Sequence, residues 1–286
     1  MTENFFKSHY FGLCLLIAGE LSFVTSHALA KSMSAQLPIF EIILFRCGLP
    51  FLGIAIFFIV TKKNLPTAHY RALISRSFFG FLSMLTLYLS LKYGLFSRVN
   101  MIVSLSALWV CLGSFFFFKE RLSLLSLLSI PVLFLGLWLL LNPTVYGIGW
   151  GDLWALITSI TTAISLISIK KLRRHCDSLT IIGAFFGMST LLTLPACLVV
   201  FTHPTQSQWV ALLTLSGFGF LGQWLMTLGF KYTSASIASF LKLTGLPLTI
   251  LCGIFCFHDT LSLIGLLGLS LFLGALGVIS TGKNRL

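Results

Sequence analysis

Charged side chains are scarce in this sequence, and acidic ones are especially rare. Charged residues make up 9% of the 286 residues, and only 7 residues are Asp or Glu, whereas about a quarter of the residues of a soluble domain are charged. Hydrophobic residues reach 57%, and the mean hydropathy is +1.00. This composition excludes an ordinary water-soluble globular domain and indicates a protein that lies in the lipid bilayer.

Motifs of enzymes and metal sites are also missing. The sequence contains neither the H-E-x-x-H motif of zinc proteases nor the G-x-S-x-G motif of serine hydrolases. None of its seven cysteines forms a C-x-x-C pair, so we expect them to be packing residues. We therefore expect no enzyme activity, no catalytic residue, no metal and no cofactor. A long polar segment is lacking too, and a membrane scaffold or receptor would need one; a non-transporting scaffold is the alternative from another functional class.

Long apolar stretches fill most of the chain. Each is about 20 residues long, which suffices to cross about 30 Å of hydrocarbon as a helix. They lie near residues 10–30, 38–60, 72–91, 97–118, 122–141, 150–169, 178–201, 208–229, 233–257 and 260–281. The sequence therefore predicts an all-α, polytopic membrane protein with ten transmembrane helices.

The chain also repeats itself at a spacing of 139 positions. Lys92-Tyr93 recurs as Lys231-Tyr232, and the segment KERLSL at 119–124 recurs as HDTLSL at 258–263. The same spacing relates Gly12 to Gly151 and Lys31 to Lys170. Because each copy has an odd number of spans, the two copies must lie in opposite orientations. We expect two inverted five-helix repeats, residues 1–145 and 146–286, which are characteristic of alternating-access transporters.

The net charge of +12 follows the predicted topology. With the N-terminus in the cytoplasm, 14 basic residues lie on the inner side, Arg76 among them, and three on the outer side, namely Lys31, Lys92 and Arg98. This asymmetry follows the positive-inside rule. We expect both termini in the cytoplasm, an inner (plasma) membrane location and basic loops beside anionic lipid, with no nucleic-acid partner.

A cleaved signal peptide is an alternative for the first span. Lys7 precedes an apolar run, and Ala28-Leu29-Ala30 resembles a cleavage site. Glu20 interrupts that run, however, and both Gly12 and Lys31 have repeat partners. These features favour a retained span.

Four ionisable residues within the predicted spans stand out as candidates. They are Glu20, Glu41, Arg46 and Lys242. Such a group costs at least about 2.5 to 3.5 kcal/mol at the bilayer centre, so it usually faces the protein interior and has a function. Two alternatives remain: Glu41 lies close enough to a helix end to be solvated, and Arg46 could form a structural ion pair with Glu20 or Glu41.

Prolines follow two of these charges. Pro50 lies four residues after Arg46, and Pro247 leaves the carbonyl of Leu243, next to Lys242, without its helical partner. Transporters use broken helices to line substrate cavities. We therefore predict a central cavity that binds substrate through Glu20, Arg46 and Lys242.

Further polar and aromatic side chains are candidates for the same substrate site. They are Glu41, Ser104, Ser106, Trp109, Gln223 and Thr244. Glycines at 265, 268, 274 and 277 allow close helix contact in the tenth span. They predict a packing face, which a homodimer could also use.

Taken together, these features resemble the drug/metabolite transporter superfamily in its EamA-like family. The resemblance covers essentially the whole chain and rests on the two five-span repeats, the buried Arg46 early in the second span, and the acidic Glu120 and Asp259 that precede the last span of each repeat. Phe40-Glu41 and Phe45-Arg46 are also similar to the second span of bacterial S-adenosylmethionine transporters. The resemblance implies a cavity between the repeats and a small metabolite moved by alternating access.

The repeats are not symmetric at the charged positions. The spacing of 139 places Ser159 opposite Glu20 and Phe185 opposite Arg46. Two cations and one carboxylate suit a zwitterion, so we predict transport of an amino acid or a derivative, such as S-adenosylmethionine. Nucleotide-sugar and multidrug transport are the alternatives within the superfamily. Glu20 could carry a coupling proton, whereas an exchanger needs no such residue.

Overall fold

The structure is a computed structural model that describes residues 2–62, 69–118, 124–141, 148–233, 235–259 and 262–281. Within these residues all regular secondary structure is helical. Of the repeated segments at 119–124 and 258–263, positions 119–123 and 260–261, Glu120 included, lie outside the described residues.

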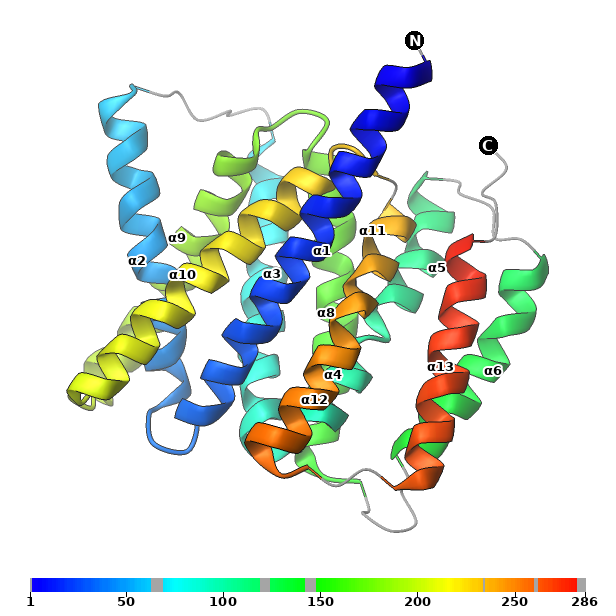
Figure 1. The fold of residues 1–286 in the computed structure, drawn as a ribbon. Helices are drawn as coiled ribbons and strands as arrows, with labels where there is room; N and C mark the ends of the chain where they lie inside the picture. Colours follow the sequence, from blue (N-terminus) through cyan, green and yellow to red (C-terminus); the bar gives the residue numbers. More distant parts are fainter. Residues whose placement is uncertain are drawn as a thin grey trace.

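The helices form a bundle whose members run roughly side by side (Figure 1). They are α1 (Thr2–Met33), α2 (Ile39–Val60), α3 (Tyr70–Tyr93), α4 (Phe96–Val103), α5 (Ser106–Phe118), α6 (Leu124–Leu141), α8 (Trp150–Leu172), α9 (Ser178–Val199), α10 (Gln206–Gly229), α11 (Ala235–Leu241), the 3₁₀ helix η1 (Lys242–Gly245), α12 (Leu246–Phe257) and α13 (Leu263–Thr281). Among the described residues, seven helical stretches are long and apolar enough to cross a membrane, and α4 and α5 count as one of them. Three shorter apolar helical stretches lie at Leu128–Leu139, Lys242–Phe257 and Leu263–Ala275.

Two of the predicted spans are broken in the middle. The fourth is interrupted at Ser104 and Leu105, between α4 and α5, and the ninth is interrupted by η1. Ser104 and Leu243 are related by the spacing of 139, so both breaks fall at the same place in the repeat. The sequence predicted breaks at Pro50 and at Pro247 but none at Ser104. The prediction at Pro50 was wrong, because α2 continues through Pro50 as one helix.

The two halves of the chain are interlocked. Helix α1 packs along α10, and α3 packs along α8. A Cβ at Gly12 would lie 2.6 Å from Cβ of Tyr232, and a Cβ at Gly151 would lie 2.7 Å from Cα of Gly94. The two repeated glycines therefore have equivalent roles. Each lets its helix approach the end of a helix from the other half of the chain.

The repeated lysines also have equivalent contacts. Lys31 Nζ donates hydrogen bonds to the carbonyls of Leu91 (2.5 Å) and Gly94 (2.7 Å), which end α3. Lys170 Nζ donates to the carbonyls of Phe230 (3.0 Å) and Thr233, which follow α10. Each lysine thus caps carbonyls that a helix leaves unpaired at its C-terminus.

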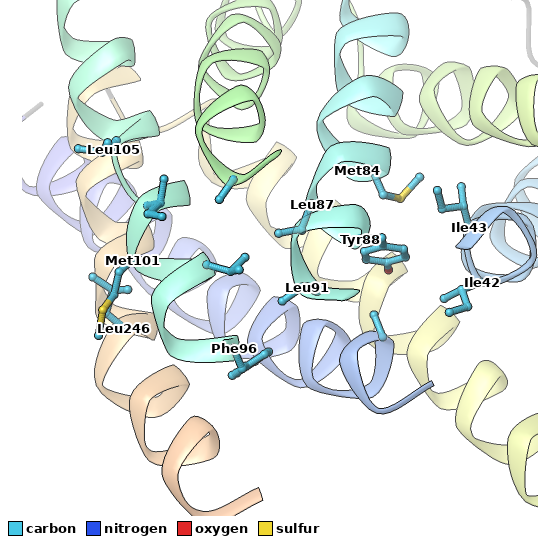
Figure 2. Packing of buried hydrophobic residues seen from close by; sticks show 14 of the residues in the cluster. Ile42, Ile43, Met84, Leu87, Tyr88, Leu91, Phe96, Met101, Leu105 and Leu246 are labelled. Atoms are coloured by element: carbon cyan, nitrogen blue, oxygen red, sulfur yellow. The ribbon is translucent and has the colours of Figure 1, made fainter. Parts of the chain in front are cut away.

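Buried hydrophobic residues fill the bundle at one end. In Figure 2, Ile42 and Ile43 of α2 face Met84 and Tyr88 of α3. At that end α4 lies against α12, with the rings of Phe96 and Phe257 4.9 Å apart. The Asp259 carboxylate accepts a hydrogen bond from the backbone N–H of Ser97 (2.7 Å) and so caps α4 from the end of α12.

One glycine of α13 lies at a close contact with another helix of the same chain. A Cβ at Gly136 of α6 would lie 2.8 Å from the carbonyl oxygen of Gly268, so α6 and α13 touch closely. Nothing lies within 4 Å of a Cβ at Gly274. Gly268 therefore lies in the predicted packing face, which contacts α6. The homodimer stays a prediction.

Candidate functional site

A cavity of about 120 Å³ lies in the interior of the bundle. Residues of nearly every helix around it contribute to its lining, from both halves of the chain. Four of the lining residues have acidic or strongly basic side chains: Glu20 of α1, Arg46 of α2, Arg76 of α3 and Lys242 of η1. Because such groups are costly within a membrane, their gathering in one place marks a functional site.

Six of the nine candidate residues from the sequence line this cavity. They are Glu20, Arg46, Ser104, Ser106, Gln223 and Lys242. The two serines flank the break between α4 and α5, and Lys242 lies in the break between α11 and α12. Helix breaks therefore place three of the six side chains.

The other three candidates lie outside the cavity lining. Glu41 is in the first turn of α2, fully buried, and accepts hydrogen bonds from the backbone N–H (3.2 Å) and the hydroxyl (2.7 Å) of Thr202. Trp109 donates its indole N–H to Ser159 Oγ (3.0 Å). Thr244 is exposed and bonds the carbonyl of Leu241. Each has a local structural partner instead of a position in the cavity.

Glu20 lies against the break in the ninth span. A Cβ at Gly245 would lie 2.8 Å from Cγ and 3.2 Å from Oε1 of Glu20. Lys242 is near enough for its charge to interact with the carboxylate. Because α12 begins at Leu246, Glu20 also lies beside a helix N-terminus, whose partial positive charge favours a carboxylate.

Arg46 is held without a carboxylate partner. Its side chain is buried, its Nη1 lies 2.6 Å from Met84 Sδ, and its guanidinium carbon lies 5.8 Å from the centre of the Tyr88 ring. Its Nε is buried and makes no hydrogen bond in the structure. Within the described residues, Arg46 forms an ion pair with neither Glu20 nor Glu41, so the structural-pair interpretation is not supported.

His27 is a cavity residue that the sequence analysis did not single out. It lines the cavity beside Asn100, and both Arg46 and Lys242 are within electrostatic range. Glu20, Phe23 and His27 recur at helical spacing. That spacing from an identified site residue was the available signal.

Arg76 is the second missed residue. The charge tally assigned it to the cytoplasmic side, but α3 begins at Tyr70 and carries Arg76 into the bundle, where it is 1% exposed. It lines the cavity, with its guanidinium carbon 4.6 Å from the centre of the Phe185 ring. Arg76, Gly80, Ser83 and Leu87 occupy one helical face, and this pattern could have revealed it.

Equivalent positions of the two halves line the cavity together. Examples of lining pairs related by the spacing of 139 are His27 with Leu166, Arg46 with Phe185, Met84 with Gln223, Val103 with Lys242, and Ser106 with Gly245. In each pair one side chain is polar where its partner is apolar or absent. Equivalent positions of the two halves thus contribute to one cavity, but the side chains at these positions differ in polarity.

A bundle of membrane-length apolar helices around a charged cavity, with two helices broken beside it, defines a multi-pass membrane transporter. The chain belongs to the EamA-like transporter family, whose model matches residues 10–142 and again residues 149–281. It is therefore a member of the drug/metabolite transporter superfamily.

Relatives with names are distant but cover most of the chain. The chain is 24% identical over 242 residues to "Pseudopaline exporter CntI" of Pseudomonas aeruginosa (strain UCBPP-PA14), which covers 82% of this chain and 84% of that protein. It is 24% identical over 276 residues to an "Uncharacterized transporter" of Helicobacter pylori (strain ATCC 700392 / 26695), covering 92% of both. A solved crystal structure matches with a TM-score of 0.71 at 16% identity, over 92% of this chain and 94% of that chain. This last likeness concerns the fold alone.

Proposed function

We propose that this protein is a secondary transporter that moves a small zwitterionic metabolite, an amino acid or a derivative, by alternating access. The observation that carries the proposal is one cavity whose lining includes both the Glu20 carboxylate and the cations Arg46 and Lys242. Glu20 would bind the ammonium group of the substrate, and the cations would bind its carboxylate. Matched charges stabilise such a complex in a low-dielectric cavity when their geometry is good.

The size of the cavity bears on the substrate. At roughly 10 to 15 Å³ for each water-sized group, 120 Å³ has room for about ten such groups. This size favours a free amino acid over S-adenosylmethionine or a nucleotide sugar in the conformation described. The cations also disfavour a hydrophobic cation, so multidrug transport ranks lower.

The topology belongs to the same proposal. Ten spans result when the three shorter apolar helical stretches join the seven long ones, and five spans in each half place the halves in opposite orientations. The two matches to the family model support two repeats. Export is the direction that the name of the Pseudomonas relative suggests, and the proposed location is the plasma membrane.

Uptake into proteoliposomes tests the proposal. The purified protein would be offered labelled amino acids, S-adenosylmethionine and nucleotides in parallel, with either face exposed to substrate. We expect Arg46→Ala and Lys242→Ala each to lower substrate affinity about thirty-fold or more, since removing a buried charge from a contact costs about 2 to 5 kcal/mol. Lys171→Ala is the matched control, because Lys171 is an exposed cation outside the cavity. Normal affinity in both cavity variants would contradict the proposed site.

A further inference from the structure

We infer that Arg76 forms a second anion-binding subsite in the cavity, so that the transported solute carries two anionic groups and one ammonium group. The inference rests on the proposed function and specifies its substrate class as an amino acid with a second carboxylate or phosphate. It starts from the charge of the described lining residues: Arg46, Arg76 and Lys242 are cations, and Glu20 is the one carboxylate among them. An ordinary zwitterion brings one negative and one positive group, and would leave this excess uncompensated.

The Arg76 guanidinium has no partner in the described structure. Its Nε and Nη1 are buried and make no hydrogen bond, and the side chain is 1% exposed. The face of the Phe185 ring, 4.6 Å away, is its main neighbour. A ring face attracts a guanidinium but accepts none of its in-plane N–H groups. Leaving buried donors of a charged group unpaired is costly, so the donors need an acceptor that the cavity itself does not supply.

Arg76 also points in an unusual direction. Helical side chains normally lean toward the N-terminus of their helix, and a basic residue near a helix end usually reaches for the membrane surface. The Nη1 of Arg76 instead lies against Gly80, one turn further along α3, so closely that a Cβ at Gly80 would collide with it. The missing side chain at Gly80 therefore makes room for the guanidinium on the cavity side of α3.

Arg46 approaches the same helix one turn further on. Its Nη1 contacts Met84, four residues after Gly80, and its Nε lies where a Cβ at Gly219 would come within 2.7 Å. Both guanidinium groups therefore lie beside α3, Arg76 at Gly80 and Arg46 at Met84, and both line the cavity. Two separate cationic groups in one cavity suit two anionic groups on one solute, such as those of a dicarboxylic amino acid.

Binding to matched pairs of amino acids tests this inference. The probes are glutamate and 2-aminoadipate, each compared with its side-chain amide, and phosphoserine compared with serine. Ligand-induced thermal stabilisation and competition for uptake would be measured on the whole protein. For the wild type we expect affinity at least tenfold higher for an acidic probe than for its neutral counterpart. The acidic pair that shows the preference distinguishes a carboxylate from a phosphate as the second anion.

Arg76→Met is the main variant, because its side chain is apolar and of similar length. We expect it to abolish the tenfold preference, with a much larger loss of affinity for the acidic probe than for its neutral counterpart, whereas Arg46→Met should weaken both members of a pair alike. Arg71→Met is the matched control: Arg71 is in the same helix but exposed, and its Nε bonds the hydroxyl of Tyr70. It should behave like the wild type.

Stability of the ligand-free protein gives an independent readout. If Arg76 is kept for a ligand, Arg76→Met should melt at the same or a higher temperature than the wild type, because an uncompensated buried charge is removed. A lower melting temperature, or a variant that does not fold, would assign Arg76 a structural role and overturn the inference. An unchanged preference in Arg76→Met would overturn the second subsite while the zwitterion proposal stands. If the wild type binds none of these amino acids, the proposed function fails and the subsite fails with it.

Discussion

Glu20 is the one carboxylate among the described residues that line the cavity, and its surroundings decide between three roles. It lies beside Lys242, against Gly245 and at the N-terminus of α12. A coupling proton, a substrate ammonium group or a structural ion pair would each use such a position. In the described part of the structure, Glu20 forms an ion pair with neither Arg46 nor Lys242, although the charge of Lys242 interacts with it. We therefore take coupling and substrate binding as the two mechanisms to separate.

Glu20→Gln separates them, because the amide keeps the shape of the side chain but cannot change its charge. We expect both gradient-driven uptake and substrate exchange to fall together, with weaker direct binding, since we assign Glu20 to the substrate ammonium group. Loss of concentrative uptake with intact exchange would instead show that Glu20 carries the coupling proton. Glu41→Gln is the control, since Glu41 is bonded to Thr202 outside the cavity, and transport by this variant should stay near wild type.

The sequence predicted the charged residues in the middle of spans well, and those near span ends poorly. Glu20 and Lys242 interrupt long apolar runs, so their position inside the bundle was evident from sequence. Arg76 lies near the start of a run, where a basic residue is equally consistent with a cytoplasmic boundary, and only the direction of its side chain distinguishes the two. His27 was missed because its neutral form costs little in an apolar run. Trp109 follows a helix break and Thr244 lies within one, and a break changes which face of the helix meets the cavity.

At the scale of elements, the two broken helices shape the site. The sequence predicted the break beside Pro247, because proline removes a backbone donor, but Ser104 and Leu105 carry no such local signal. Only the equivalence of Ser104 and Leu243 at the spacing of 139 points to the second break. In both helices the break brings polar side chains to the cavity.

The break at η1 allows a direct test with glycines. Gly245→Ala would place a Cβ 2.8 Å from Cγ of Glu20 and 3.0 Å from Cγ2 of Val24, so Glu20 must move. We expect a loss of substrate affinity of about tenfold, equivalent to about 1.4 kcal/mol, measured in the uptake assay. In Gly217→Ala nothing lies within 4 Å of the new Cβ, and the helix propensity of alanine should leave stability unchanged or raise it by up to about 1 kcal/mol. Equal affinity in both variants would argue against the contact of Glu20 with the break.

The lysine caps give a second prediction at this scale. Lys31→Met and Lys170→Met each remove two hydrogen bonds to carbonyls at a helix end. Hydrogen bonds from a charged group contribute about 1.5 to 3 kcal/mol, so each variant should have a lower melting temperature than the wild type. The two single variants should lower it equally, and the double variant by the sum of both effects, because the sites do not share partners. Lys171→Met, one position from Lys170 and exposed, should melt like the wild type. A clear effect of only one lysine would show that the caps are not equivalent.

At the scale of the whole molecule, contacts between distant segments define two ends of the bundle. The rings of His69 and His175 stack 4.5 Å apart and bring the start of α3 and the α8–α9 connection together at one end. Gln208 bonds Gln36 at the other end (2.8 Å). Helix α1 begins and α13 ends at the same end of the bundle (Figure 1). Of the described basic residues outside the cavity, Lys62, Arg71 and the group from Lys170 to Arg174 share the end with the stacked histidines, whereas Lys31, Lys92 and Arg98 lie at the opposite end.

The final prediction tests inversion and orientation with one pair of positions. Ser32 and Lys171 are equivalent at the spacing of 139, and both are exposed. Each would be replaced by cysteine in a protein whose seven native cysteines are removed, after its transport activity is verified. With a membrane-impermeant thiol reagent, Ser32→Cys should react in intact cells, and Lys171→Cys only after permeabilisation, because inverted repeats place equivalent positions on opposite sides and the basic end lies in the cytoplasm. Labelling of both positions from the same side would contradict inversion. The reverse pattern would keep the inverted repeats and overturn the orientation alone, since the basic end would then lie outside the cell.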